Sequence, residues 1–179
     1  MPRHESVWSA TAQMPECAPL RENAHVEVCV VGAGMAGLTT AYLLVQAGKS
    51  VAVLDDGPLA GGMTSMTSGH LVSMLDDRYY ALEKLHGREG ARLAAQSHSA
   101  AIDRIEAIVA REGIDCDFSR LDGYLFLAEG DSAETLDREL AAAQRAGLHA
   151  VQRLERAPYA PWDTGPCLRF PAQGAAATA

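Results

Sequence analysis

The stretch that decides the fold is "VEVCVVGAGMAGLTTAYLLVQAGKSVAVLDD", residues 26–56. Residues 25–31 form a β-branched run that predicts a strand buried on both faces. Residues 34–46 carry Ala, Leu and Val in helical succession, and residues 50–54 predict a second buried strand. Two such strands around one helix form a βαβ unit, whose strands are parallel and whose crossover is right-handed. The sequence therefore predicts the start of an α/β fold.

Three glycines, Gly32, Gly34 and Gly37, lie between the first strand and the helix and match the pattern G-x-G-x-x-G. In a nucleotide-binding βαβ unit they provide a tight turn, room for a pyrophosphate against the backbone, and close packing of helix on strand. The exposed N–H groups and the dipole of the helix N-terminus favour the negative phosphates. Asp55 follows the second strand, where a carboxylate can accept the hydroxyl protons of a ribose. These residues predict a dinucleotide site and leave NAD and FAD open, because both carry an ADP half.

The next segment, "DGPLAGGMTSMTSGHL" (residues 56–71), favours FAD. Its Gly, Ser and Thr content predicts a long ordered loop rather than a helix. A simple NAD-binding fold would start another helix soon after the second strand. A loop rich in hydroxyls and backbone donors can instead fold back over a pyrophosphate and lead towards a flavin ring.

These two stretches together resemble the FAD-dependent oxidoreductases of the D-amino-acid-oxidase-like (DAO) superfamily. Within it, the sequence is most similar to bacterial members that carry a C-terminal Rieske iron–sulfur domain. Their lead-in is similar to "SVWSATA", and their loop pattern G-x-T-x-x-T-[TS]-[AG]-H-L matches residues 62–71. The resemblance is most specific over residues 28–71 and extends weakly to about Gly174. It implies a Rossmann-like FAD/NAD(P)-binding βαβ unit followed by the start of a substrate domain, in a chain that looks truncated.

The resemblance also implies which residues contact FAD. Those expected at the pyrophosphate are Gly32, Gly34, Met35, Ala36 and Gly37. Asp55 is expected at the adenosine ribose, and Asp56 beside the adenine half. The residues expected at the phosphates, the ribityl chain and the near side of the isoalloxazine are Thr64, Thr67, Ser68, Gly69 and His70. Members of the family usually have Glu where this chain has Asp55. Some relatives attach FAD covalently through a His, and Met66 stands at that position here, so we expect non-covalent FAD. No residue is assigned a catalytic acid–base role.

The whole chain divides into four segments on this interpretation. They are a surface arm (1–24), the FAD-binding segment (25–78), a helical and strand continuation towards the substrate domain (79–157), and an irregular Pro- and Ala-rich tail (158–179). The continuation is expected to hold a helix over 79–111 that is interrupted near "HGREG". A strand is expected from Gly123, and a helix whose N-terminal capping pattern starts at Asp131.

Two clusters of side chains have a structural and a functional interpretation. Asp76, Asp77 and Arg78 precede a predicted helix, so N-terminal capping and matching of the helix dipole are favoured over a charged site. Four aromatic side chains could form walls of a substrate cavity, although core packing is favoured. They are Tyr79, Tyr80, Tyr124 and Phe126.

Composition limits the partners. The net charge is −8 and the isoelectric point is about 5.2, which disfavours nucleic acid and anionic membrane surfaces. The four cysteines lie far apart, without metal-ligand spacing, so no metal site is expected. No membrane span or targeting segment is recognised, which predicts a cytoplasmic protein. The resemblance implies a small-molecule substrate.

Three functions remain open from the sequence. The first is an FAD oxidoreductase, present as its N-terminal part, whose intact form transfers hydride from an amine or similar small substrate to flavin, with a missing C-terminal half or Rieske domain. The second is an NAD-dependent dehydrogenase. The third is a non-catalytic remnant that binds nucleotide poorly. The loop after Asp55 favours the first over the second.

Overall fold

The computed structural model describes residues 6–11, 14–128, 130–159 and 161–176, and the side chains of Val7 and Ser9 are not described. Contacts divide the chain into two units, one ending at Ser68 and one starting at Gly69. The sequence-based boundary, after Arg78, falls later. The division comes earlier because β3 (His70–Leu71) pairs with β6 (Cys167–Ala175), which commits the end of the loop to the second unit.

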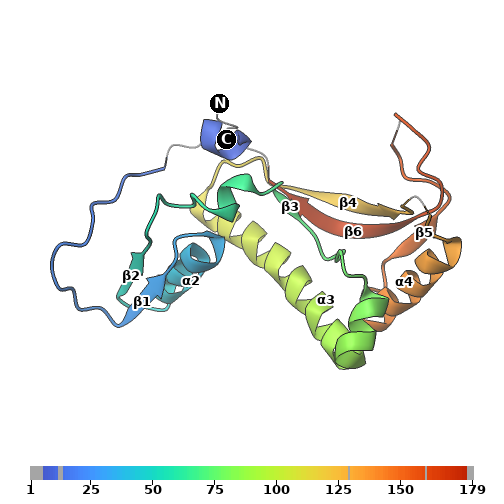
Figure 1. Ribbon diagram of the computed structural model, residues 1–179, viewed down its shortest axis with the longest axis horizontal. Helices are drawn as coiled ribbons and strands as arrows, with labels where there is room; N and C mark the ends of the chain where they lie inside the picture. The colour runs from blue at the N-terminus through green and yellow to red at the C-terminus, as the bar shows by residue number, and fades with distance from the viewer. Residues whose placement is uncertain (1–5, 12–13, 129, 160, 177–179) are drawn as a thin grey trace. The chain divides into compact units, whose positions relative to one another are not determined.

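The first unit contains the predicted βαβ motif (Figure 1). Strand β1 (Val28–Val31) and strand β2 (Val51–Leu54) are parallel, with Val28 opposite Val51 and Val31 opposite Leu54. Helix α2 (Met35–Gln46) connects them and packs on both strands. Beside this motif the unit has two short helices, α1 (Val7–Thr11) and the 3₁₀ helix η1 (Met63–Met66). The α/β prediction for this stretch is confirmed.

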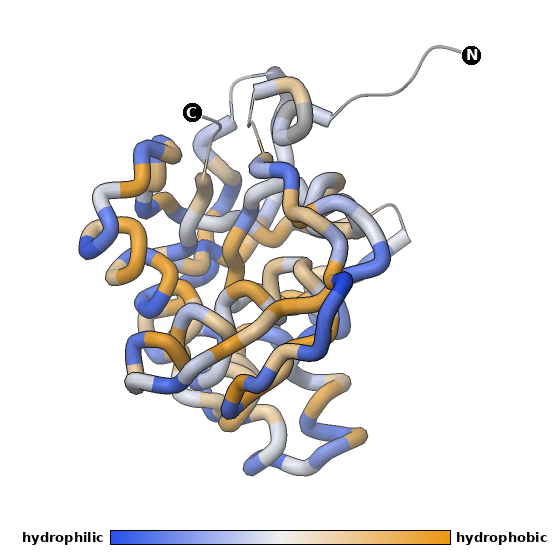
Figure 2. Tube along the Cα trace, turned by 90° about the vertical axis from the view of Figure 1, so that its left-hand side faces the viewer, coloured by the Kyte–Doolittle hydropathy of each residue, from blue (hydrophilic) through white to orange (hydrophobic). Residues whose placement is uncertain are grey.

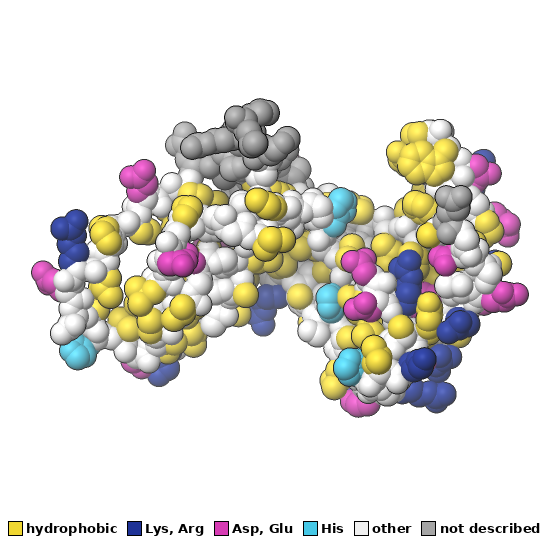
Figure 3. All heavy atoms as spheres, viewed as in Figure 1, with side chains coloured by type: hydrophobic (Ala, Val, Ile, Leu, Met, Phe, Trp, Pro, Cys, Tyr) yellow, Lys and Arg dark blue, Asp and Glu magenta, His cyan; other side chains and the backbone are white. Residues whose placement is uncertain are grey.

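The prediction that both strands are buried on both faces is wrong. Val31 is 84% exposed, and Leu54 is 38% exposed. Within the first unit, α2 covers one face of this two-stranded sheet, so alternate side chains of β1 remain accessible to solvent. Figure 3 shows hydrophobic side chains at the surface over this part of the chain.

The second unit is built on an antiparallel sheet in the order β3, β6, β4 (Ser119–Phe126), with β5 (Gln152–Leu154) also paired to β6. The helices of this unit are α3 (Tyr79–Glu112) and α4 (Ala133–Arg145). The predicted interruption of the long helix is confirmed, because Gly87 has a φ of 71° inside α3. This positive φ is readily adopted by glycine, which lacks a Cβ.

The C-terminal segment corrects the prediction of an irregular tail over 158–179. Residues Cys167–Ala175 form β6, which pairs with β3, β4 and β5 and is therefore the central strand of the sheet. Residues 177–179 lie outside the described part of the chain. The strand escaped detection because Pro171 and Gly174 are residues that usually argue against a central strand.

The core of the second unit lies between the sheet and its two helices. Leu125, Leu168 and Phe170 contribute from the strands, and Tyr79 and Leu136 from α3 and α4; all five side chains are buried. In Figure 2, hydrophobic and hydrophilic segments alternate along the helical turns, as expected of helices that bury one face. Tyr79 and Tyr80 therefore have the predicted packing role.

The N-termini of α3 and α4 correct the predicted caps. Arg78 occupies the N-cap position of α3 without a side-chain cap, and the backbone N–H groups of Tyr79 and Tyr80 donate to Glu139 at 3.0 and 3.3 Å. Helix α4 has Ser132, not Asp131, at its N-cap position. Glu139 lies on the buried face of α4 and is 1% exposed, so one carboxylate connects the two helices.

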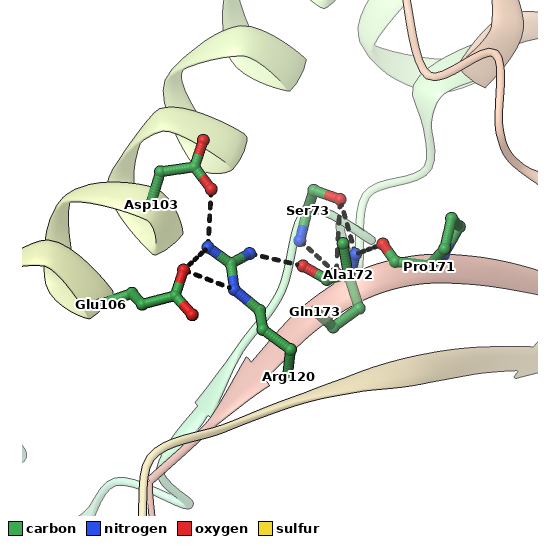
Figure 4. Close-up of polar contacts among 7 residues, drawn as sticks. All are labelled: Ser73, Asp103, Glu106, Arg120, Pro171, Ala172 and Gln173. Carbon is green, nitrogen blue, oxygen red and sulfur yellow. Dashed lines mark hydrogen bonds and ion pairs between the residues drawn. The ribbon is translucent and has the colours of Figure 1, made fainter.

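A second polar network fixes α3 to the strands (Figure 4). The Arg120 guanidinium of β4 donates to Asp103 at 2.6 Å, to Glu106 at 2.7 Å and to the carbonyl of Ala172 at 2.8 Å. These charge-assisted bonds connect α3, β4 and β6.

Among the described residues, no helix has the length and apolar character needed to cross a membrane. The cytoplasmic location stays a prediction.

Candidate nucleotide site

The turn between β1 and α2 has the geometry that its glycines predict. Gly32 has a φ of 103°, a conformation that L side chains rarely adopt. A Cβ on Gly37 would lie 1.8 Å from the carbonyl oxygen of Gly32, so only glycine allows the helix to start this close to the strand. A Cβ on Gly34 would lie 3.3 Å from the Thr64 hydroxyl oxygen. The turn is therefore shaped to bring backbone, not side chains, to the N-terminus of α2.

The N-terminus of α2 faces the loop that follows β2. Gly34 is at the N-cap position and has no side chain to cap the helix, and the Met35 N–H donates to the Thr64 hydroxyl at 3.0 Å. The Ala60 N–H donates to the carbonyl of Ala33 at 2.9 Å. Both contacts bring residues 57–66 against the turn, as predicted for a loop that folds back over a pyrophosphate.

Asp55 connects the end of β2 to the glycine turn. Its Oδ2 accepts the Ala33 N–H at 2.5 Å and its Oδ1 accepts the Gly57 N–H at 2.8 Å. These two hydrogen bonds, the Ala33 one first, lower the pKa of the Asp55 carboxyl below its ordinary value. A carboxylate oxygen can accept two hydrogen bonds. The Asp55 anion can therefore bind the turn and still accept hydrogen bonds from ribose hydroxyls.

These groups surround one cavity of about 670 Å³. Eight of the predicted FAD-contact residues line it: Gly32, Gly34, Met35, Ala36, Gly37, Asp55, Asp56 and Thr64. The lining combines a helix N-terminus, exposed backbone and a carboxylate. This donor and acceptor set fits the diphosphate and ribose of a dinucleotide.

The other four predicted residues lie elsewhere. Thr67 and Ser68 follow η1 and do not line this cavity. Gly69 and His70 belong to the second unit, where His70 pairs with Ala175 between β3 and β6. The structure therefore brings together the residues predicted for the ADP half of the cofactor, and the flavin-side contacts of these four residues stay predictions.

Trp8 is a contact that sequence reasoning missed. Its indole N–H donates to the carbonyl of Thr67 at 2.6 Å, and α1 packs on η1. Residues 6–11 thus pack on η1, whereas residues 14–24 are exposed, as expected of an arm that lies on the surface. A lone Trp among polar residues could have indicated this contact, because such a large apolar side chain usually packs against a partner.

His70 also lines a pocket of the second unit, together with Tyr124 and Phe126. The sequence favoured core packing for these two aromatic residues. The structure instead places them in a pocket wall, because residues of β4 alternate between the two faces of the sheet and Leu125 takes the core-facing position.

Comparison with known proteins identifies the family to which this geometry belongs. Residues 27–177 match the family described as FAD dependent oxidoreductase (DAO). The chain belongs to this family. The family is FAD-dependent, and the resemblance recognised in the sequence is confirmed.

Individual relatives of this DAO-family chain agree with that assignment. The protein named for a Rieske 2Fe–2S iron–sulfur centre, YhfW of Bacillus subtilis (strain 168), is 28% identical over 144 residues, which are 80% of this chain and 28% of YhfW. Gamma-glutamylputrescine oxidoreductase of Escherichia coli (strain K12) is 31% identical over 159 residues, 87% of this chain and 37% of that enzyme. The structure of L-amino acid deaminase from Proteus vulgaris matches with a TM-score of 0.66 at 20% identity, covering 92% of this chain and 37% of that one. The mixed α/β fold is thus confirmed, and the DAO-family chain spans about a third of the length of these relatives.

Proposed function

We propose that this chain is the FAD-binding N-terminal part of an oxidoreductase that acts on an amine or an amino acid. The observation that carries the proposal is the single cavity lined by Gly34, Met35, Asp55 and Thr64 at the N-terminus of α2. Membership of the DAO family supports FAD over NAD. When bound, the flavin supplies the acceptor for a hydride from the substrate.

The chain's own residues bind and orient the ADP half of FAD. The N–H groups of Met35 and Ala36, in the first turn of α2, donate to the pyrophosphate, where the helix dipole adds to the attraction. Asp55 accepts protons from the adenosine ribose while it keeps the turn in shape, and Asp56 lies beside the adenine half. With FAD bound, the Met35 N–H would donate to a phosphate oxygen in place of the Thr64 hydroxyl that accepts it here.

Further features of the proposal rest on the resemblance and the relatives. Thr67, Ser68, Gly69 and His70 are assigned to the phosphates, the ribityl chain and the flavin ring. FAD is non-covalent, because Met66 stands where some relatives have the attaching His. A Rieske-type iron–sulfur domain is the proposed electron-transfer partner, and its support is the name of the Bacillus relative.

The test is flavin retention by the purified protein and by a glycine variant. Gly34→Val adds a branched side chain where even a Cβ approaches the Thr64 hydroxyl to 3.3 Å, so it fills the place of a phosphate oxygen. Gly48→Asn is the matched control, because Gly48 follows α2 at its other end and has open space around it. Asn also tolerates its positive φ of 79°.

We expect flavin absorbance bands in the wild type and in Gly48→Asn, released by denaturation, and their loss in Gly34→Val with unchanged circular dichroism. Equal flavin content in Gly34→Val would place FAD elsewhere. A wild-type protein that takes up NAD and no FAD would contradict the proposal.

A further inference from the structure

The second unit contains a pocket of about 490 Å³ on the outer face of its sheet. Tyr124 and Phe126 of β4 line it, whereas Leu125 between them is buried in the core. The pleat of β4 therefore separates a core face from a pocket face. All the residues that line this pocket belong to the second unit.

An aromatic pair forms the far wall of the pocket. Tyr159 and Trp162 lie in the segment between β5 and β6, with ring centroids 4.5 Å apart and planes at 72°, an edge-to-face contact. They are 48% and 55% exposed, and Phe126 is 42% exposed. Figure 3 shows hydrophobic side chains gathered at the tip of this segment, at the upper right. Three large rings left open to solvent around one pocket are typical of a binding site rather than a core.

Two hydrogen bonds lie within the segment that carries the aromatic pair. The Ala157 N–H donates to the Thr164 hydroxyl at 2.9 Å, and the Gly165 N–H donates to Asp163 at 3.0 Å. The first bond joins the two ends of the segment, and the second forms a turn directly after Trp162.

The lining of the pocket includes a carboxylate that can accept a hydrogen bond from a ligand. Its lining contains the Asp122 carboxylate and the His70 imidazole, and no Lys or Arg among the described residues that form it. Oδ2 of Asp122 accepts from Arg169 Nε at 2.6 Å, which orients the carboxylate and leaves Oδ1 available to a donor in the pocket. A protonated amine is a ligand group that both a carboxylate oxygen and the electron-rich faces of aromatic rings attract.

We propose that this pocket binds an arylalkyl amine in its ammonium form, with the aryl group against Tyr159, Trp162 and Phe126 and the ammonium group at Asp122. The binding is a property of the second unit. Its interpretation as the substrate class of the enzyme rests on the proposed FAD function.

An α-amino acid is the competing occupant. Its carboxylate would need a cation, and the nearest candidate, Arg169, is engaged with Asp122 and does not line the pocket. The extra carboxylate would therefore lose water without gaining a cation of its own, which costs binding free energy. The proposal predicts discrimination against the amino acid.

Binding is measured by the emission of Trp162. The chain has two tryptophans, so Trp8→Phe leaves Trp162 as the reporter in an otherwise complete chain. The ligands are 2-phenylethylamine, L-phenylalanine, which adds a carboxylate, and 2-phenylethanol, which lacks the charge. Asp122→Asn removes the negative charge with little change of shape, and Glu155→Gln is a control that removes a nearby charge outside the pocket lining.

We expect saturable binding of 2-phenylethylamine that is about tenfold tighter than that of either other ligand, the difference expected of one partly exposed charge contact. Asp122→Asn should abolish this preference, and Glu155→Gln should leave it unchanged. Equal or tighter binding of L-phenylalanine, or no saturable binding of the amine, overturns the proposal. If Trp8→Phe lowers the helical content, calorimetry on the wild-type chain replaces the emission measurement with the same expected order of ligands.

FAD retention, measured in the same preparation, keeps the two proposals separable. Amine binding supports this inference whether or not FAD is retained. FAD retention without amine binding overturns this inference and leaves the nucleotide site intact.

Discussion

At the scale of the residue, Asp55 shows how one carboxylate serves both the turn and the ligand. Its oxygens accept the Ala33 and Gly57 N–H groups, so it fixes the glycine turn before any nucleotide arrives. The sequence predicted the position of this acid from its distance to Gly32. It could not predict the two backbone contacts, because they depend on the exact reach of the Asp side chain.

Asp55→Asn tests this role. The pKa of the Asp55 carboxyl is lowered in the folded state, so its contribution to stability is present above the unfolded-state pKa of about 4 and is lost as the pH falls through the lower folded-state value. We expect the wild type to lose more stability than Asp55→Asn between pH 5 and pH 3 (roughly the window of an Asp carboxyl). Urea unfolding at each pH measures this difference, and hydrogen exchange of the Ala33 amide reports on the turn. Parallel pH profiles with unchanged Ala33 exchange would show that Asp55 does not fix the turn.

At the scale of the element, β6 and α4 each have a feature that the sequence pattern did not predict. Leu168 and Phe170 alternate with Arg169 as a strand should, but Pro171 argues against a central strand. The structure accommodates Pro171 at an irregularity, because the register between β4 and β6 shifts between Leu121 and Gly123. Such a bulge depends on the partner strand, so no pattern within β6 alone predicts it.

The role of Glu139 of α4 was likewise not predicted from the sequence. It follows Leu136 by three positions and precedes Ala143 by four, so helical spacing places it on the buried face. That spacing was a usable signal, but the sequence did not reveal which donors Glu139 meets. Those donors are the first N–H groups of α3, which need an acceptor wherever a helix begins in the interior.

Replacing Glu139 should therefore destabilise the second unit. Glu139→Ala leaves the Tyr79 and Tyr80 N–H groups without their acceptor and should lower the free energy of unfolding by about 2–4 kcal/mol. Glu139→Gln keeps one acceptor oxygen and should lower it less.

Burial, opposed by these two hydrogen bonds, raises the pKa of the Glu139 carboxyl. The folded state then binds the proton more tightly, so this group's contribution falls as the pH rises from the unfolded-state pKa through the folded-state value.

Urea unfolding across that pH range checks both points. The control is Glu134→Ala, because Glu134 lies in the first turn of the same helix and is exposed. A Glu139→Ala variant no less stable than Glu134→Ala, or a Glu139→Gln variant with the wild-type pH dependence, would contradict the capping role.

At the scale of the whole molecule, the two units differ in how far sequence reasoning reaches. The βαβ motif and the ADP-half residues of the first unit were predictable, because glycines, helix and acid follow a fixed spacing set by the geometry of a phosphate on a helix N-terminus. The pocket of the second unit was not, because its walls come from β4 and from the segment before β6, which are distant in sequence. The chain covers 28–37% of the relatives it was compared with, so the activity of the full enzyme stays a proposal.

The central claim is that the cavity at the N-terminus of α2 binds the ADP half of FAD. Calorimetric titration of the complete chain with FAD, ADP and FMN tests it most directly, because FMN has the flavin and lacks the adenosine. We expect FAD and ADP to bind, ADP to compete with FAD, and Gly34→Val to abolish the binding of both. Binding of FMN as tight as that of FAD, with no competition by ADP, would contradict it.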